Sequence, residues 1–268
     1  LEIQVFPNGA LGSDPQMIGA VRGGTLDITL TGNPFFTGMA PKLNVLDLPF
    51  LFDTRAHVAK VLDGAIGDGL RRELEGSNLK ALATWEVGWR NLTNSRKPVS
   101  TAADIRGLKI RTTPNPAHVK AFQLLGAVPT PMAFTELFNA LEQKTVDGQE
   151  NPVTLILNAK FFEVQRHLSL TRHAFTSAPL VMNNTKFNAL APDLRDVLTS
   201  TAIEMAAAQR KMNEDAEGSS LDALKKAGMQ AVETPDRGSF SRIVTEEVRK
   251  EFVGRYGSEV LDAILKVA

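Results

Sequence analysis

The residues whose types and spacing suggest chemistry are two arginines and a short polar run. Arg111 ends the apolar segment Gly107–Arg111, and Arg90 lies upstream of it. A guanidinium is a planar fork that holds a carboxylate through two parallel hydrogen bonds, which a lysine cannot copy. Further along the chain, Glu150 and Asn151 offer hydrogen-bonding groups for hydroxyls. Together these residues predict recognition of an organic acid.

Each of these side chains also has an ordinary structural role open to it. A strand-end arginine is usually solvated or caps a helix, and Arg90 has Glu86 and Glu150 as available ion-pair partners. Asn151 precedes Pro152 and would by default cap a helix. From these residues alone, the structural and the binding interpretations both stay open.

Phe134 and His173 have two interpretations of the same kind. Phe134 follows Pro131-Met132-Ala133, where an aromatic ring belongs more often to the core than to a stacking surface. His173 lies between two strand-like segments and is more often an interior histidine than a ligand contact.

The stretch Gly107–Pro152 contains the elements that must position these groups. Its pattern predicts a strand ending at Arg111, a helix, a second strand, another helix and a polar turn over Asp147–Pro152. This βαβα order is typical of an α/β sheet whose loops gather at one edge, where small ligands bind. We therefore expect Arg111 and the triplet Gln149-Glu150-Asn151 to meet at that edge.

The rest of the chain predicts two α/β domains. Pairs of strands meet without a helix between them near Gly88 and near Ser177, which predicts chain crossings between domains. We expect one domain from residues 1–88 with 177–216 and a second from residues 89–176 with 217–268. The other expected elements are helices at Asp14–Arg22, His57–Leu74 and Asp193–Lys226, two helices after Pro235, and strands at Leu1–Phe6, Leu26–Thr31, Leu79–Val87, Gly88–Asn94, Arg166–Thr171, Ala174–Met182 and Met229–Val232.

Two of these segments carry further expectations. Asp193–Lys226 contains no proline and a single glycine, so it predicts a helix far longer than the average of about 11 residues, one that spans both domains as a brace. Phe35 and Phe36 begin a long irregular segment and predict a hydrophobic anchor beneath it.

Composition argues against several classes of function. The 268 residues carry 30 basic and 30 acidic side chains, so no net charge attracts nucleic acid or an anionic membrane. There are no cysteines and the four histidines lack metal-ligand spacing, so we expect neither a metal nor a cofactor. No nucleotide-binding or hydrolase motif is present, and no apolar run reaches the roughly 18 residues of a membrane span. The chain opens on Leu1 rather than Met, which predicts that residues precede it.

Six segments then point to one family: Ala127–Glu136 (AVPTPMAFTE), Ala140–Gln143 (ALEQ), Val146–Pro152 (VDGQENP), Gly107–Arg111, Arg90–Asn94 and the pattern Phe6-Pro7-x-x-x-Leu11-Gly12. With these segments the sequence closely resembles the substrate-binding receptors of TRAP transporters, the tripartite ATP-independent periplasmic family of the dicarboxylate-receptor type. The similarity extends along nearly the whole chain.

This resemblance implies an α/β architecture like that of periplasmic binding proteins, with crossing hinge strands, a long helix across both domains and an organic acid between them. It implies that Arg111 pairs with the ligand carboxylate and that Arg90, Asn151 and Phe134 assist, while His173 matches a ligand contact of some members. The protein is then expected to be a periplasmic receptor, monomeric, that delivers its cargo to membrane subunits.

The expected cargo is a hydroxylated monocarboxylate such as a uronic or aldonic acid. Its hydroxyls have Glu86, Glu150, Asn33, Asn151 and His173 available to them. The strand end at Thr31-Gly32-Asn33 lacks the acidic group of some sialic-acid receptors, which argues against sialic acid.

Two rival functions remain open from sequence. One is an enzyme on the same two-domain scaffold that acts on a sugar acid with Glu150 and His173 as acid and base. The other is an extracytoplasmic sensor domain, which is weaker because the chain shows no membrane segment.

Overall fold

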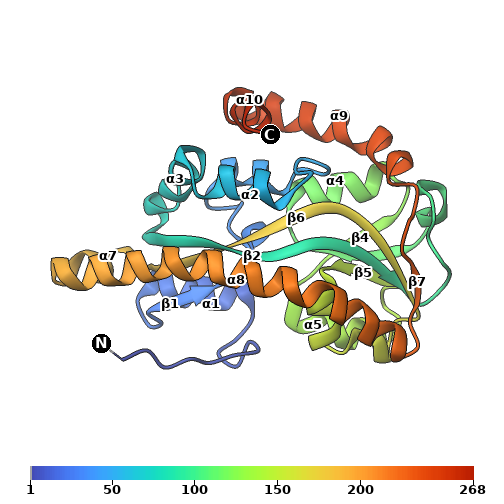
Figure 1. The fold of residues 1–268 in the computed structure, drawn as a ribbon, viewed down its shortest axis with the longest axis horizontal. Coiled ribbons are helices and arrows are strands. Elements are labelled where there is room, and N and C mark those ends of the chain that lie inside the picture. The colour runs from blue at the N-terminus through green and yellow to red at the C-terminus, as the bar shows by residue number, and fades with distance from the viewer. Residues whose placement is uncertain (1) are drawn as a thin grey trace.

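A mixed sheet of seven strands runs through the protein, whose computed structural model describes residues 2–268 (Figure 1). Within these residues the strands lie in the order β1-β6-β2-β5-β3-β4, and β7 pairs with β6. The strands are β1 (Ile28–Leu30), β2 (Leu79–Asn94), β3 (Lys109–Thr112), β4 (Val128–Pro131), β5 (Gly148–Asn151), β6 (His167–Asn183) and β7 (Gln230–Val232).

Helices lie on both sides of this sheet. In Figure 1, α2, α4 and α9 are drawn above β2 and β6, and α1 and α5 below them. The helices are α1 (Asp14–Gly23), α2 (Arg55–Leu62), α3 (Ala65–Arg72), α4 (Pro116–Leu124), α5 (Phe134–Glu142), α6 (Val153–Asn158), α7 (Asn184–Ala189), α8 (Pro192–Lys226), α9 (Arg237–Tyr256) and α10 (Glu259–Lys266), with short 3-10 turns η1 (Asn33–Phe35) and η2 (Pro41–Asp47) in the long loop.

Strands β2 and β6 are the two long strands that join the halves of the sheet. They pair antiparallel from Leu79 opposite Asn183 to Asn94 opposite His167. Each is one continuous strand, where the sequence predicted two. The register shifts between Glu86 and Gly88, and Gly88 faces Thr176, so the two predicted crossings lie opposite each other. Gly88 has a φ of 123°, a conformation that favours glycine and explains the break at this position.

The predicted βαβα unit is confirmed, with one correction. Strand β3 lies between β4 and β5 and is parallel to both. The segment predicted as a polar turn is instead the strand β5, buried between β3 and β2. Sequence periodicity missed it because its side chains are polar and find their partners inside the protein.

The predicted helix His57–Leu74 is wrong as a single element. The structure has α2 and α3, separated at Asp63-Gly64. Thr54 caps α2 by accepting a hydrogen bond from the backbone N–H of His57. A Cβ on Gly67 would lie 2.1 Å from the Leu62 carbonyl oxygen, so α3 can fold this closely against the end of α2 only with glycine there.

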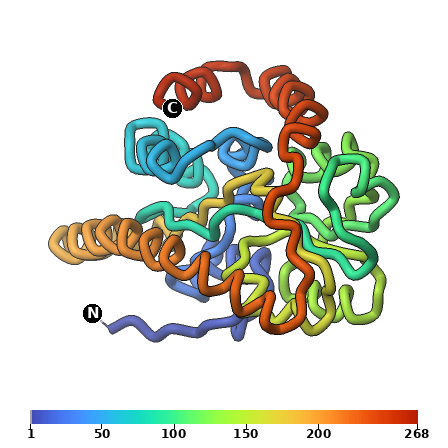
Figure 2. The backbone as a smooth tube through the Cα atoms, turned by 45° about the vertical axis from the view of Figure 1, so that its right-hand side comes forward, coloured from blue at the N-terminus to red at the C-terminus, as the bar shows by residue number. Residues whose placement is uncertain are grey.

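The predicted brace is confirmed: α8 is a 35-residue helix along both halves (Figures 1 and 2). Its first part packs through Leu198 and Ala202 into a cluster with Leu82 of β2. Its last turn places Leu224 in a separate cluster with Leu137 of α5. One continuous helix therefore contacts the cores of both halves.

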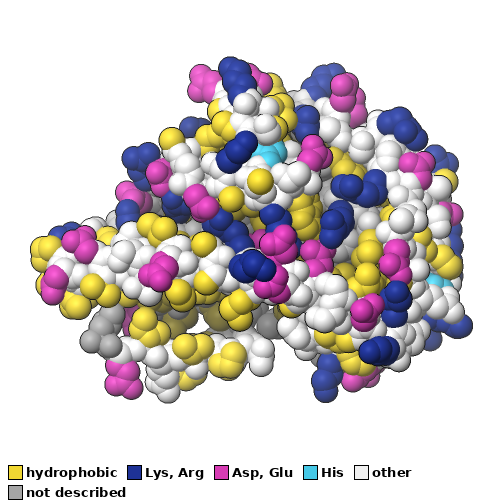
Figure 3. Space-filling view, viewed as in Figure 1, with side chains coloured by type: hydrophobic (Ala, Val, Ile, Leu, Met, Phe, Trp, Pro, Cys, Tyr) yellow, Lys and Arg dark blue, Asp and Glu magenta, His cyan; other side chains and the backbone are white. Residues whose placement is uncertain are grey.

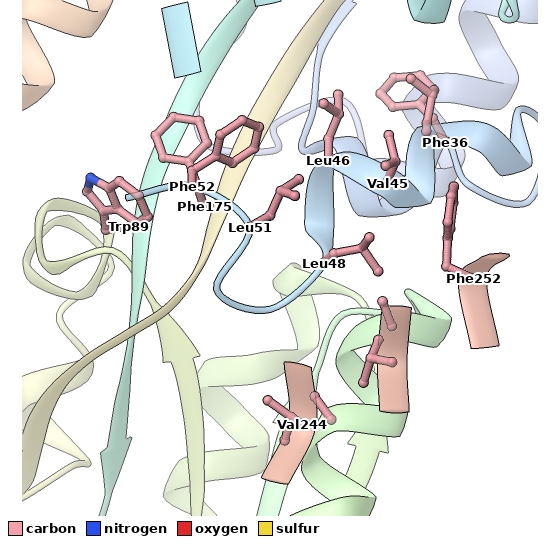
Figure 4. Packing of buried hydrophobic residues seen from close by; sticks show 14 of the residues in the cluster. Phe36, Val45, Leu46, Leu48, Leu51, Phe52, Trp89, Phe175, Val244 and Phe252 are labelled. Carbon is pink, nitrogen blue, oxygen red and sulfur yellow. The ribbon is translucent and has the colours of Figure 1, made fainter. Parts of the chain in front are cut away.

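The largest hydrophobic cluster lies between the sheet, the long loop and α9 (Figure 4). Phe175 packs edge-on against Trp89 and Phe52, at centroid distances of 5.2 and 6.0 Å. Phe36 is fully buried here, as predicted for an anchor under the loop, whereas Phe35 is only partly buried and also lines a cavity. Helix α9 contacts α4 and η2, and α10 contacts α3, so the C-terminal helices touch both halves.

The first residues differ from the prediction. A strand was expected over Leu1–Phe6, but Leu1 lies outside the described residues and residues 2–6 form no strand. Ile3 and Val5 are 60% and 76% exposed. The alternating pattern produces no strand because no neighbouring strand of the described chain pairs with it.

Basic and acidic side chains are interspersed on the face shown in Figure 3. This agrees with the equal numbers of the two charges in the sequence. None of the helices within residues 2–268 combines the length and the apolar character needed to cross a bilayer.

The close approach of β5 to β2 gives a testable expectation. A Cβ on Gly148 would lie 2.2 Å from the Thr93 carbonyl oxygen, so Gly148→Ala must displace one strand and should lower the free energy of unfolding by about 1–3 kcal/mol. Gly218→Ala on α8 meets open space and should instead stabilise the protein by up to about 1 kcal/mol. Urea unfolding measures both, and a Gly148 variant as stable as the native chain would contradict the packing described.

Candidate functional site

A cavity of about 350 Å³ lies where the two halves of the sheet meet. The end of β1 with η1 borders it on one side, and the ends of β3 and β5 with α5 and α6 on the other. Strands β2 and β6 and one face of α8 complete the wall. The polar lining residues include Asp14, Thr31, Glu86, Arg90, Arg111, Thr113, Asn151, Asn158, Thr176, Gln209 and Asn213, and the apolar ones include Leu30, Phe35, Val87, Phe134, Leu155 and Ala178.

Arg111 is the cation in this wall that lacks a protein carboxylate. It lies in β3 and is 1% exposed. Its Nε and Nη2 donate to the Met132 carbonyl oxygen at 3.1 and 2.7 Å, which fixes the plane of the fork. Among residues 2–268 no carboxylate lies within ion-pair distance of it, and Nη1 has no hydrogen-bond partner.

Burial lowers the pKa of Arg111 to about 10, against the opposing charge of Glu150. The group therefore stays charged at neutral pH although it is desolvated. A buried charge without a counter-ion is costly, and an anion entering the cavity would remove that cost.

Arg90 is also buried but is already neutralised by Glu150. Its Nε donates to Glu150 Oε2, its Nη2 donates to Oε1 at 2.8 Å and to the Glu150 carbonyl oxygen at 2.6 Å, and its Nη1 reaches Thr176 Oγ1 at 3.1 Å. Burial opposes ionisation of Glu150, but Arg90 and a bond from His173 hold the pKa of this carboxyl below its ordinary value. The pair is thus a buried salt bridge beside the cavity.

Asn151 connects this pair to the cavity wall. Its Oδ1 accepts from Arg90 Nη2 at 3.2 Å, and its Nδ2 donates to Gln149 Oε1 at 2.6 Å. Gln149 in turn donates to Thr93 at 2.8 Å. This chain of bonds holds the Asn151 amide in one orientation.

The structure brings some of the predicted residues to the cavity and places others behind it. Arg111, Arg90, Asn151, Phe134 and Glu86 line the cavity, although the carboxylate of Glu86 is bound by Arg55. Glu150 is not a lining residue, and neither is His173, which contacts Glu150 Oε2 at 3.2 Å and Thr171 at 2.8 Å.

Asn33 is also away from the lining. It is fully buried and donates to Asp47 Oδ2 at 2.6 Å and to the Leu43 carbonyl oxygen at 3.0 Å. Asp47 accepts a second bond, at 2.8 Å, from Asn115, which also caps α4. Burial raises the pKa of Asp47 to about 8, so this carboxyl is protonated at neutral pH.

Sequence reasoning missed two groups of lining residues. Asp14 is the first residue of α1, and burial raises its pKa while the nearby charge of Arg111 opposes the rise. Gln209 and Asn213 lie on the face of α8 turned to the sheet. The predicted long helix was the available signal for these two, because its face toward the sheet has to carry groups that match a polar cavity.

Within residues 2–268 no group of three or more His, Cys, Asp or Glu side chains is arranged to hold a metal ion. The histidines at this site contact protein groups instead, as His118 does with Thr113 at 2.8 Å.

Two α/β halves around a cavity, with a buried cation left open to it, define a solute-binding protein. The family model described as "Bacterial extracellular solute-binding protein, family 7" matches residues 1–254. The chain belongs to this family.

Relatives and solved structures agree. The 2,3-diketo-L-gulonate-binding periplasmic protein YiaO of Escherichia coli is 44% identical over 269 residues, covering 100% of this chain and 82% of that protein. A TRAP periplasmic solute-binding protein of Polaromonas, solved bound to D-erythronate, superposes with a TM-score of 0.95 at 41% identity, over 97% of this chain and 86% of its own. The sugar acid binding protein of Advenella mimigardefordensis, solved with galactonate, gives a TM-score of 0.93 at 38% identity, over 99% of this chain and 87% of its own.

These findings confirm the resemblance and the two-domain architecture. The protein is a periplasmic receptor of a TRAP transporter that binds a small organic acid, so membrane subunits are its implied partners. The rival enzyme has no support, because the family and its structural neighbours are binding proteins of transporters. The Glu150–His173 pair proposed for it is buried and bonded to Arg90 and Thr171.

The buried carboxyl of Asp47 predicts a pH-dependent stability. Its pKa is about 8 in the folded protein against 3.8 ordinarily, so the native state binds the extra proton between those values. Stability should therefore fall as pH rises through this window, by up to about 1.4 kcal/mol per pH unit from this group. Asp47→Asn copies the protonated side chain and should flatten the fall, as followed by urea unfolding from pH 5 to 9. The exposed control Asp222→Asn should leave the slope unchanged, and equal slopes in all three proteins would contradict a proton on Asp47.

The buried Arg90–Glu150 ion pair predicts a large loss of folding stability when one partner is removed. Glu150→Gln leaves the guanidinium buried without a counter-ion, and the free energy of unfolding should fall by about 3–5 kcal/mol. Glu233→Gln removes the exposed partner of Lys225 and should cost less than about 1 kcal/mol. Similar small losses in both variants, measured by urea unfolding, would show that the buried pair is dispensable.

Proposed function

We propose that the cavity captures a hydroxylated monocarboxylate, an aldonate or uronate, with the carboxylate on Arg111. The observation that carries this proposal is the buried guanidinium without a protein carboxylate in the described chain. The Met132 carbonyl oxygen occupies the Nε–Nη2 edge of the fork and leaves the Nη1–Nη2 edge for the cargo carboxylate. A charge-assisted bond in a site without water is stronger than the same bond in solvent.

The charge balance favours a single negative charge on the cargo. Glu150 already neutralises Arg90, so of the two buried arginines Arg111 remains for the ligand. Asp14 and Glu86, which also line the cavity, are acidic. A second carboxylate on the cargo would therefore meet no free cation in this wall, and dicarboxylates should bind more weakly than monocarboxylates.

The rest of the lining suits a polyhydroxylated carbon skeleton. We propose Asn151, Arg90 and Glu86 as contacts for hydroxyls and Phe134 as a surface for the carbon chain. We propose that Glu150 and His173 hold Arg90 in place, and that Asn33 holds the loop behind the cavity through Asp47. Bonds to charged groups contribute about 1.5–3 kcal/mol each, so several are needed to reach the roughly 8–12 kcal/mol of a micromolar to nanomolar receptor.

The ligands of related proteins support this class of cargo. The structures from Polaromonas and Advenella hold D-erythronate and galactonate, and the Escherichia coli relative is named for 2,3-diketo-L-gulonate. Each of these molecules has one carboxylate and several oxygen functions along a short chain.

Delivery is proposed to follow closure of the two halves over the cargo. In this proposal residues 1–88 with 177–216 move against residues 89–176 with 217–268, about a hinge near 88 and 177. Cargo that contacts both halves shifts the protein toward the closed form, and that form docks on the membrane subunits. We propose that the receptor acts as a monomer, which analytical ultracentrifugation with and without cargo would test.

Calorimetry tests the carboxylate contact. We expect D-galactonate, D-glucuronate or D-erythronate to bind the native protein, and Arg111→Ala to weaken that binding at least about 100-fold because the cargo charge loses its partner. Arg111→Lys should recover only part of the affinity, since an ammonium cannot copy the fork. Arg166→Ala, on the exposed surface, is the control. Succinate should bind less tightly than any of the three, and native affinity in the Arg111→Ala variant would remove Arg111 from its proposed role.

A further inference from the structure

Around Glu86, just before the register shift at Gly88, one edge of strand β2 has no neighbouring strand in the part of the chain that the structure describes. Its pairing with β6 covers the other edge along the whole strand. Strand β5 pairs with β2 only from Asn91 to Asn94, so it does not reach the segment around Glu86. Backbone groups at such an edge are costly when they are shielded from water without partners.

Helix α8 takes the place of the missing strand there through one side-chain amide. The Glu86 backbone N–H donates to Gln209 Oε1 at 3.0 Å, and Gln209 Nε2 donates to the Glu86 carbonyl oxygen at 2.8 Å. Asn213 Nδ2 donates to the same carbonyl at 3.2 Å. An amide that accepts from and donates to one residue reproduces the hydrogen bonds of a neighbouring strand.

Further bonds attach α8 to the same side of the break. Arg210 Nη2 donates to the Thr84 carbonyl oxygen at 3.0 Å, and Trp85 Nε1 donates to the Ala202 carbonyl oxygen at 3.0 Å. These contacts and the amide of Gln209 all precede Gly88, where the register shifts and the backbone takes its positive φ. Gln209 is the side chain of α8 that bonds both the N–H and the carbonyl oxygen of Glu86, with Asn213 one turn later, and both line the cavity.

We propose that Gln209 is a positioning residue for domain closure. Its amide fixes β2 at Glu86, so that the part of α8 up to Gln209 moves with the half of the protein that precedes the break and the rotation of β2 is confined to Gly88 and its neighbours. Gln209 also lies in the cavity wall. The side chain that holds β2 in place beside the hinge is therefore one that a bound cargo can contact. This inference rests on the proposed function in one respect, that the two halves close over a sugar acid.

The first test requires no cargo. The chain has no cysteine, so Lys60→Cys on α2 and Glu142→Cys on α5, both exposed, attach one spin label to each half. Gln209→Met keeps the length of the side chain and removes the amide. The distance distribution measured by pulsed electron resonance should widen in this variant. Glu204→Met, on the exposed face of α8, should keep the native distribution, and equal widths in both variants would overturn the proposal.

The second test follows cargo release. The two tryptophans, Trp85 and Trp89, flank the break and report on it by their fluorescence. With D-galactonate in a stopped-flow instrument, Gln209→Met should dissociate about tenfold faster, since two backbone bonds are lost, while the association rate stays within about twofold. A lower melting temperature with native release kinetics would indicate a purely structural role and would overturn the proposal.

The two proposals fail in different ways. Loss of D-galactonate binding in Arg111→Ala together with native distances and native release in Gln209→Met would reject only the role of Gln209. Retained binding in Arg111→Ala would reject the carboxylate contact, while the cargo-free distance distribution would still support or overturn the role of Gln209.

Discussion

Two guanidinium groups are buried next to one cavity, and the protein supplies a single bonded carboxylate for the pair. Glu150 binds Arg90 with both oxygens, whereas Arg111 has a backbone carbonyl oxygen as its partner. The charge of Arg90 also acts on Arg111 and favours its neutral form. Burial at this depth is costly for a cation, so the empty site stores free energy that a bound anion releases. This imbalance favours an anionic cargo.

The sheet topology explains how the two arginines come to be neighbours. β2 carries Arg90, β3 carries Arg111, and β5 lies between them with Glu150 and Asn151. Gly148 permits this arrangement, since any larger residue would collide with Thr93. The same two long strands, β2 and β6, continue into the other half, so that the cation site and the proposed hinge belong to one continuous structure. Helix α8 then ties both halves together along the cavity.

Much of the fold could be predicted from the hydrophobic periodicity of the sequence and from the positions of its glycines and prolines. The helix α8 was predicted to within one residue at its start, because its long pattern is uninterrupted by proline. The order of β3, α4, β4 and α5 was predicted because Pro114, Gly126 and Pro131 mark the boundaries between these four elements. The strand β5 could not be predicted this way, since Gln149, Glu150 and Asn151 are buried by hydrogen bonds rather than by apolar packing. Likewise the break between α2 and α3 depends on a contact that exists only once both helices are folded.

By itself the sequence determined the class of protein, the two arginines as candidate carboxylate ligands and the edge of the sheet where they would lie. These features depend on residue types, on local spacing and on long motifs, all of which can be read directly from the linear sequence. Only the tertiary structure decided that Arg90 is neutralised and Arg111 is not, and that Asn33 supports Asp47 rather than the cavity. The physical reason is that ion pairing is set by distance in space: Arg90 and Glu150 are 60 positions apart and meet because β2 and β5 pair with Leu92 opposite Glu150.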